Sequence, residues 1–115
     1  MENSNPSPLF CWTILYPNKE GGLFDFEIYS KTLIPQYIAM LGDNCLRYEV
    51  RKGLASPGAA APNYVCIVNV WLNSRERFRE AMVDPGMKVL LEKISAVTNI
   101  QSIRQMDEVI ASTNP

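Results

Sequence analysis

The chain has 115 residues, 47% of them hydrophobic, and its eleven Lys and Arg against twelve Asp and Glu leave a formal charge of -1. A chain of this length is expected to fold as one domain and to bury roughly two thirds of its unfolded surface. The near-neutral charge excludes the basic surface typical of proteins that bind nucleic acid or anionic membranes. Small, nearly neutral partners are therefore expected.

The chain contains no histidine. This removes the commonest general base, the Ser-His and Cys-His nucleophile pairs, and most zinc and iron sites. The glycines at 21–22 and 53–58 lack the spacing of nucleotide-binding loops, so neither a metal nor a cofactor is predicted. Cys11, Cys45 and Cys66 are widely spaced and odd in number. They indicate reduced thiols in a cytoplasmic protein, with a disulfide between two of them as the lesser alternative.

The ends of the chain are predicted to be tails. Residues 1–8 are polar, carry no basic segment, and precede an apolar run too short for a signal sequence or a membrane span. Residues 111–115 form the second tail, which leaves one domain over 9–110. Its first segment, Leu9–Tyr16, is rich in aromatic and β-branched residues, a composition that favours a strand buried on both faces.

A helix is predicted next, starting at Phe26 and ending near Gly42. Asp25 fits an N-cap better than a general base, because its carboxylate can accept from the free amides of the first turn. Pro35 lies inside the helix and lacks an N–H group, so a kink or break is expected near Leu33-Ile34.

Two strands separated by a long loop follow. Cys45–Lys52 alternates apolar and charged residues, as a half-buried strand does, and Glu49 stands among arginines where a surface ion pair is expected. Residues 53–62 are rich in Gly, Pro and Ala and predict a hairpin loop. Tyr64–Leu72 is the clearest strand, with an even-numbered face that carries no fully polar side chain.

The last third predicts a helical region in two pieces and a final strand. Ser74 is a candidate N-cap, Asp84-Pro85-Gly86 interrupts the helical spacing, and the strand is expected over about Thr98–Val109. The order β-α-β-β-α-β is that of an α+β ferredoxin-like domain, in which two helices cover one face of a four-stranded antiparallel sheet.

The other face of the sheet then needs a cover, because no further element is left in the chain. Each large apolar side chain left in water would forgo roughly 1.5–3 kcal/mol. A second copy of the chain, related by a two-fold axis, is the simplest cover. The residues expected on this uncovered face are Phe10, Trp12, Ile14, Ile67 and Trp71.

Several short motifs recur together and in order along the chain. They are Leu15-Tyr-Pro-Asn18, Phe24-Asp25 with Tyr29, Pro35, the 53–62 loop before Tyr64-Val65, and Thr98-Asn-Ile100 with Gln105 and Glu108-Val109. In these motifs the chain resembles the EthD family, named for ethyl tert-butyl ether degradation, over roughly residues 9–109. The resemblance implies a homodimeric α+β barrel, a fold also used by small monooxygenases and isomerases that act on compact, often aromatic molecules.

The chain departs from that family at two positions. Family members often carry a histidine where this chain has Leu33, and another where it has Asn69. An amide can orient or polarise a substrate, but neither it nor leucine can exchange protons as histidine does.

Two functions are therefore expected for a small hydrophobic or aromatic ligand held in the barrel. The first is a cofactor-independent enzyme of catabolic or secondary metabolism, with lyase, isomerase or oxygenase-like activity, in which Tyr16 and Asn69 polarise an oxygenated substrate. The second is a non-catalytic binding or accessory protein that keeps the barrel without the histidines. Trp12 and Trp71 are expected on the same face of the sheet as Tyr16 and Asn69. The predicted ligand-binding residues are Trp12, Tyr29, Leu33, Tyr37, Trp71 and Gln105.

Overall fold

A computed structural model describes residues 9–113. The tail expected over residues 1–8, and the last two residues of the one expected over 111–115, lie outside the described residues. The strands are β1 (Leu9–Pro17), β2 (Cys45–Lys52), β3 (Tyr64–Leu72) and β4 (Ile103–Val109). The helical elements are α1 (Phe26–Ile28), the π-helical turn η1 (Tyr29–Leu33), α2 (Ile34–Leu41), the 3-10 turn η2 (Gly42–Asn44), α3 (Arg75–Met82) and α4 (Pro85–Ser95).

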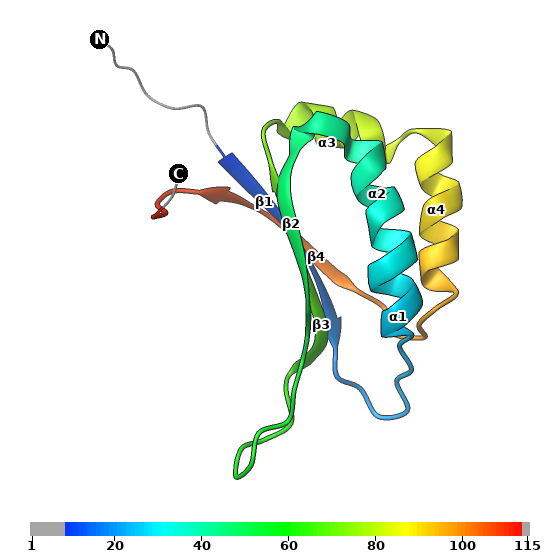
Figure 1. Cartoon of the computed structure of the whole chain (residues 1–115), viewed down its shortest axis with the longest axis vertical. Coiled ribbons are helices and arrows are strands. Elements are labelled where there is room, and N and C mark those ends of the chain that lie inside the picture. The colour runs from blue at the N-terminus through cyan, green and yellow to red at the C-terminus, as the bar shows by residue number, and fades with distance from the viewer. Residues whose placement is uncertain (1–8, 114–115) are drawn as a thin grey trace.

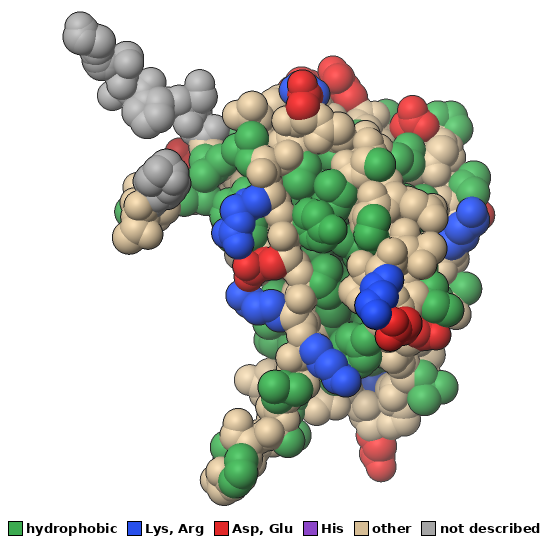
Figure 2. Space-filling view, viewed as in Figure 1, with side chains coloured by type: hydrophobic (Ala, Val, Ile, Leu, Met, Phe, Trp, Pro, Cys, Tyr) green, Lys and Arg blue, Asp and Glu red, His purple; other side chains and the backbone are tan. Residues whose placement is uncertain are grey.

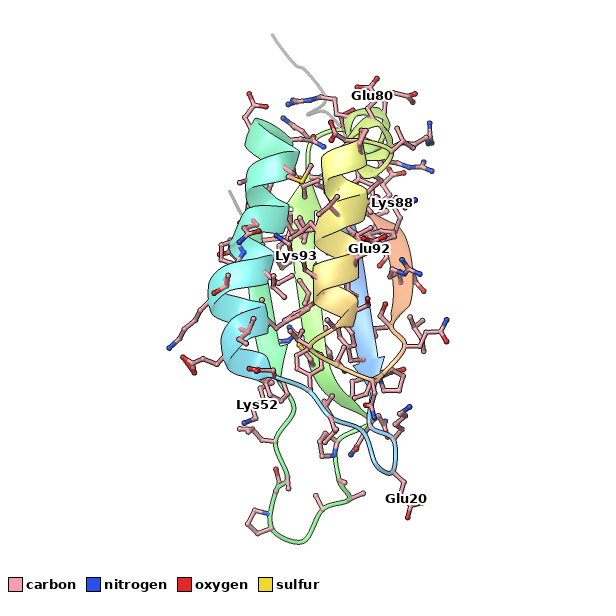
Figure 3. All side chains as sticks on the ribbon, turned by 90° about the vertical axis from the view of Figure 1, so that its right-hand side faces the viewer. Glu20, Lys52, Glu80, Lys88, Glu92 and Lys93 are labelled. Atoms are coloured by element: carbon pink, nitrogen blue, oxygen red, sulfur yellow. The ribbon has the colours of Figure 1, made fainter. Side chains whose placement is uncertain are left out.

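The four strands form one antiparallel sheet in the order β2-β3-β1-β4. All the helices lie on one face of this sheet, and no element of the described chain covers the other (Figure 1). Seen from the helix side, α2 and α4 run next to each other in front of the strands (Figure 3). The predicted ferredoxin-like α+β fold is therefore confirmed.

The strand register decides which side chains meet the helices. Trp12 lies opposite Val70 and Tyr16 opposite Cys66, so these four side chains share one face, and Val70 and Cys66 are fully buried in the core. Thr13 lies opposite Asn69, which places both on the uncovered face. The expectation that Trp12 and Tyr16 share a face with Asn69 and Trp71 is therefore wrong.

The uncovered face differs from its predicted composition for the same reason. Phe10, Trp12 and Ile14 turn toward the helices, while Cys11, Thr13 and Leu15 take their places on the open side. Only the β3 part of the prediction, Ile67 and Trp71, is correct. Successive residues of a strand point to opposite faces, so a shift of one residue in parity exchanges the whole set.

The first helix is continuous from Phe26 to Leu41 but contains one wide turn. The amide of Ile34 donates to the carbonyl of Tyr29, five residues earlier, directly before Pro35. A π-turn at this point lets the helix pass a residue that has no N–H group. The kink or break predicted near Leu33-Ile34 therefore takes the form of a π-turn within a continuous helix. Asp25 caps the helix by accepting from the amide of Ile28 at 3.1 Å.

The second helical region is two helices, as predicted. The Ser74 side chain accepts from the amide of Arg77 at the start of α3, and the Asp84 side chain accepts from the amide of Gly86 at the start of α4. Pro85 occupies the first turn of α4, where its missing N–H group costs nothing.

The last strand is shorter than predicted, since it begins at Ile103 and not at Thr98. The Thr98 hydroxyl donates to the carbonyl of Leu23 at 2.7 Å, and the Asn99 side chain accepts from the Leu23 amide and donates to the carbonyl of Gly21. These hydrogen bonds attach the segment to the loop after β1 instead of to the sheet. Residues 98–102 consequently cross the end of the sheet before β4 begins.

The loop between β2 and β3 projects from the body of the domain (Figure 1). A Cβ atom at Gly53 would lie 2.2 Å from the carbonyl oxygen of Tyr64, so the base of this hairpin admits no side chain there. The Asn18 side chain donates to the carbonyl of Pro62, which joins the C-terminal end of the loop to the end of β1.

Candidate functional site

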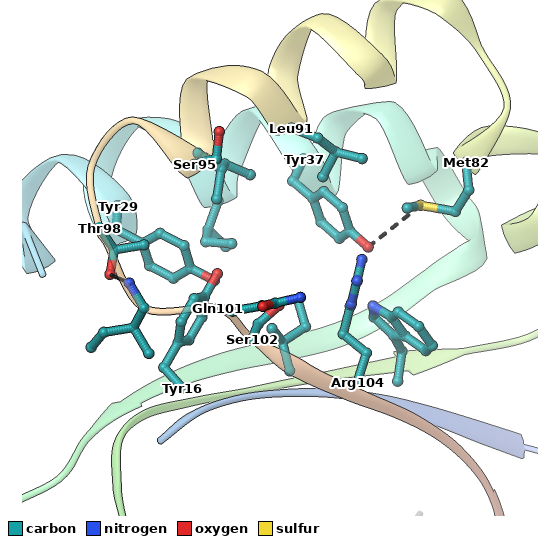
Figure 4. A pocket seen from close by; sticks show the side chains of 15 residues that line it. Tyr16, Tyr29, Tyr37, Met82, Leu91, Ser95, Thr98, Gln101, Ser102 and Arg104 are labelled. Atoms are coloured by element: carbon teal, nitrogen blue, oxygen red, sulfur yellow. Dashed lines mark hydrogen bonds between the residues drawn. The ribbon is translucent and has the colours of Figure 1, made fainter. Parts of the chain in front are cut away.

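A cavity of about 230 Å³ lies between the sheet and the helix layer (Figure 4). Strands β1 and β4, the first helix, α4 and the 98–102 segment all contribute to its walls. The lining residues are Trp12, Ile14, Tyr16, Tyr29, Ile34, Tyr37, Met82, Leu91, Ile94, Ser95, Thr98, Ile100, Gln101, Ser102 and Arg104. Most of these side chains are apolar or aromatic, as is typical of a site for a compact organic molecule.

Two tyrosines meet at one end of the cavity. The rings of Tyr16 and Tyr29 contact edge to face with centroids 5.5 Å apart, and Phe24 packs against both at 4.8 Å. The two hydroxyl groups point toward each other (Figure 4). The packing of these three rings holds both phenols in place, with their hydroxyl groups at the cavity.

The phenols of the cavity remain protonated. Burial raises the pKa of Tyr16, of Tyr29 and of Tyr37 above the ordinary value. The neighbouring Tyr29 hydroxyl lowers the pKa of Tyr16 in part, the Trp12 N–H lowers that of Tyr37 in part, and the charge of Arg104 lowers both to a smaller extent. At neutral pH these side chains are therefore hydrogen-bond donors and not bases.

Two buried donors in the cavity lack partners within residues 9–113. They are the indole nitrogen of Trp12, which lies near the hydroxyl of Tyr37, and the hydroxyl of Tyr29, which faces that of Tyr16; neither pair has the geometry of a hydrogen bond. A third donor, the Tyr37 hydroxyl, reaches only the sulfur of Met82 at 3.6 Å, and a thioether is a weak acceptor. A buried donor without a partner costs about 1–3 kcal/mol, so each of these groups would gain from an oxygen acceptor placed in the cavity.

The polar end of the cavity is formed by the segment leading into β4. Gln101 and Arg104 are exposed, Ser102 is half-buried, and the Arg104 side chain points from the sheet toward the hydroxyl of Tyr37 (Figure 4). These residues mark the mouth through which a ligand would enter. Sequence reasoning did not single them out, although Arg104 occupies a helix-facing position of β4, opposite Ile14 of β1.

Four of the predicted site residues, Trp12, Tyr16, Tyr29 and Tyr37, line this cavity. Leu33 is buried in the core and does not line it.

The remaining three predicted residues, Asn69, Trp71 and Gln105, lie on the uncovered face. Asn69 belongs to a polar row across all four strands there. Glu49, Asn69, Thr13 and Gln105 lie opposite one another in the register of neighbouring strands. The Thr13 hydroxyl donates to the Asn69 side chain at 2.9 Å, so the amide oxygen is already bonded within the chain.

Ion pairs flank this row on the edge strand β2. Glu49 accepts from Arg47 and from Arg51 at 3.0 Å each, as the sequence predicts, and the Arg47 guanidinium lies 4.2 Å from the ring centre of Trp71. Basic side chains interrupted by an acidic one run down this edge, beside the hydrophobic side chains that fill the space between sheet and helices (Figure 2).

The three cysteines are unbridged, and burial raises the pKa of Cys66 to about 12. Between residues 9 and 113, no group of three His, Cys, Asp or Glu side chains is placed to hold a metal ion. Within the same part of the chain, no helix has the length and apolar character needed to span a membrane.

The fold and the cavity together define a class, that of ferredoxin-like α+β domains with a small-molecule-sized space between sheet and helices. A scan against protein-family models found no match, and a search of curated proteins found none either. Solved structures do match. An EthD-like protein from Ralstonia eutropha JMP134 is 32% identical with a TM-score of 0.81, and the match covers 91% of this chain and 95% of that one. The chain therefore belongs to the EthD-like family.

Two more distant structures share the fold alone. SnoaB, a cofactor-independent oxygenase from Streptomyces nogalater, is 12% identical with a TM-score of 0.62, over 96% of this chain and all of that one. A dimeric ferredoxin-like protein of unknown function from Thermobifida fusca YX is 16% identical with a TM-score of 0.51, over 90% of this chain and 92% of that one.

Proposed function

We propose that this protein binds a compact apolar molecule carrying an oxygen acceptor in the cavity between its sheet and its helices. The observation that carries the proposal is the pair of buried donors, Trp12 Nε1 and Tyr29 Oη, which form no hydrogen bond within residues 9–113 and belong to the wall of a mostly apolar space. A carbonyl, ether or hydroxyl oxygen of a ligand would accept from one or both of them. Apolar walls would bind the remainder of the molecule.

The proposal favours binding with polarisation of the ligand over proton abstraction. The residues that line the cavity include no Asp, Glu or His, and the three tyrosines keep their protons at neutral pH. A donor next to the ligand oxygen would stabilise negative charge that develops on it, which is what an enol-forming or cofactor-independent oxygenation step requires. The likeness in fold to SnoaB is compatible with such a step.

A non-catalytic binding or accessory protein is the second candidate. The absence of a general base among the lining residues favours it, because donors alone bind a ligand without transferring its protons. Both candidates place the ligand in the same cavity.

We further propose that the working unit is a homodimer joined through the uncovered face of the sheet. Leu15, Ile67 and Trp71 are only half-buried on that face in one chain. A second copy would cover them, and the polar row of Asn69 and Gln105 would then lie inside the barrel. The Thermobifida fusca protein, which is dimeric and shares the fold, supports this arrangement.

Replacing Tyr29 by phenylalanine tests the site. The unliganded Tyr29→Phe protein is expected to be more stable by about 1 kcal/mol, because it loses a buried hydroxyl that has no partner. Its affinity for 2-acetylnaphthalene should fall about tenfold, while its affinity for 2-ethylnaphthalene, which has no oxygen, should not change. Chemical denaturation measures the first effect and fluorescence titration the second.

Tyr48 supplies the matched control, since it is an exposed tyrosine of β2 that does not line the cavity. Tyr48→Phe should change neither the stability nor the affinity for either naphthalene. Equal affinities of the wild-type and Tyr29→Phe proteins for 2-acetylnaphthalene would contradict the proposed site.

A further inference from the structure

Arg104 contributes the only charge to the lining of the cavity. Its position in β4 pairs with Ile14 of β1, so its side chain rises from the helix-facing side of the sheet. There it points toward the hydroxyl of Tyr37 (Figure 4). A guanidinium is always charged and presents several donors in one plane.

Arg104 also differs from the other five arginines of the chain. Arg47, Arg51, Arg77 and Arg79 each form an ion pair with a carboxylate, and Arg75 lies over the ring of Phe10. Within residues 9–113, Arg104 forms neither an ion pair nor a side-chain hydrogen bond. The cavity lining includes no carboxylate among the described residues, so the charge of Arg104 is available to an anion bound in the cavity.

We infer that the ligand of this cavity carries an acidic hydroxyl, a phenol or an enol, which is bound as its anion, and that Arg104 is the residue that selects for it. The inference rests on the proposed function and specifies its ligand class. A phenolate or enolate spreads its charge over an apolar framework that the cavity walls can contact. A carboxylate concentrates the charge, so that moving it among apolar side chains costs more.

The geometry supplies more than one donor to such an oxygen. Arg104 would provide the charge, while the hydroxyl of Tyr37 and the indole N–H of Trp12 belong to the same cavity wall and have a weak partner and no partner, respectively. Hydrogen bonds to an ionised acceptor are about twice as strong as those between neutral groups. Ligand ionisation and cavity binding would therefore reinforce each other.

Near neutral pH the ligand is the only group expected to titrate in the cavity. Burial raises the pKa of all three cavity tyrosines and brings that of Cys66, behind Tyr16 on β3, to about 12. Helix α4 contributes only Leu91, Ile94 and Ser95 to the wall. The neighbouring cation favours the ionised ligand, so the bound ligand should have a lower pKa than the free one.

The test uses 4-nitrophenol, whose phenolate absorbs at a different wavelength from the phenol, together with its methyl ether, 4-nitroanisole. The wild-type protein should bind the phenolate and lower the apparent pKa of the bound probe. Arg104→Met should weaken phenolate binding about tenfold, with no change for 4-nitroanisole. Arg104→Lys, which keeps the charge, should recover most of the loss. Arg79→Met removes a charge from the outer face of α3 and should leave both probes unaffected.

The outcomes separate the inference from the function on which it rests. Arg104→Met could bind 4-nitrophenol as tightly as the wild-type protein does, or its affinity for 4-nitroanisole could fall as much as its affinity for 4-nitrophenol. Either result would overturn the selection by Arg104 and leave the cavity standing as a binding site. If the wild-type protein binds neither probe at about 1 mM, the proposed function fails and the inference fails with it.

Discussion

Replacing Ile67 by glutamate is expected to convert the protein from a dimer into a monomer. Ile67 lies on the uncovered face in β3, between Leu15 of β1 and Arg51 of β2. A two-fold interface contains every substitution twice, so two carboxylates would enter an apolar contact. The neighbouring Arg51 already pairs with Glu49, so each new carboxylate would be buried without a partner of its own. Such a charge costs about 3–5 kcal/mol, enough to raise the dissociation constant by a factor of about a thousand or more. Sedimentation velocity over a range of protein concentrations measures the change.

A glutamate on the helix layer provides the control for this substitution. Val89 on α4 is 53% exposed, so Val89→Glu adds the same charge at a surface that the proposed dimer leaves free. This variant should sediment as the wild-type protein does. A wild-type protein that stays monomeric at high concentration, or an Ile67→Glu variant that stays dimeric, would contradict the proposed interface.

Replacing Asn44 by alanine is expected to lower the free energy of unfolding by about 2–4 kcal/mol. Asn44 is 1% exposed and lies in η2, at the entry to β2. Its side chain donates to the carbonyl of Ser74 at 3.0 Å and accepts from the Ser74 amide at 2.8 Å. Alanine would leave the Ser74 amide without a partner in a partly buried place, and the Ser74 carbonyl would keep only the amide of Phe78 as a donor. Urea denaturation measures the loss.

The neighbouring Asn73 gives a matched comparison, because its side chain is exposed and forms no hydrogen bond within residues 9–113. Asn73→Ala should stay within about 0.5 kcal/mol of the wild-type protein. Equal stability of the Asn44→Ala and Asn73→Ala variants would show that Asn44 does not hold the start of α3 against the start of β2.

The order of elements could be predicted from the sequence, but the face of each strand could not. In β2 the apolar and charged residues alternate, and in β3 the single strongly polar residue, Asn69, marks the open side. In β1 every residue from Leu9 to Tyr16 except Thr13 is apolar or a cysteine, so no alternation marks the parity. The register with β3 decides it, and that register depends on contacts between residues 47 to 62 positions apart.

The candidate site was predictable in part for the same reason. The aromatic residues Trp12, Tyr16, Tyr29 and Tyr37 were recognisable by type, and all four line the cavity. Asn69 attracted attention as a polar residue in an apolar strand, yet its place in a polar row bonded to Thr13 is visible only in the assembled sheet. The sequence did not indicate that Arg104 lines the cavity, because an arginine in an edge strand is ordinarily a surface residue.

The helix-side location of the ligand is the central claim, and a crystal structure of the protein with 2-acetylnaphthalene tests it most directly. The predicted result is the ligand between sheet and helices, with its carbonyl oxygen within hydrogen-bond distance of Tyr29 Oη or Trp12 Nε1. A ligand found instead on the open face of the sheet, beside Asn69 and Gln105, would contradict the claim.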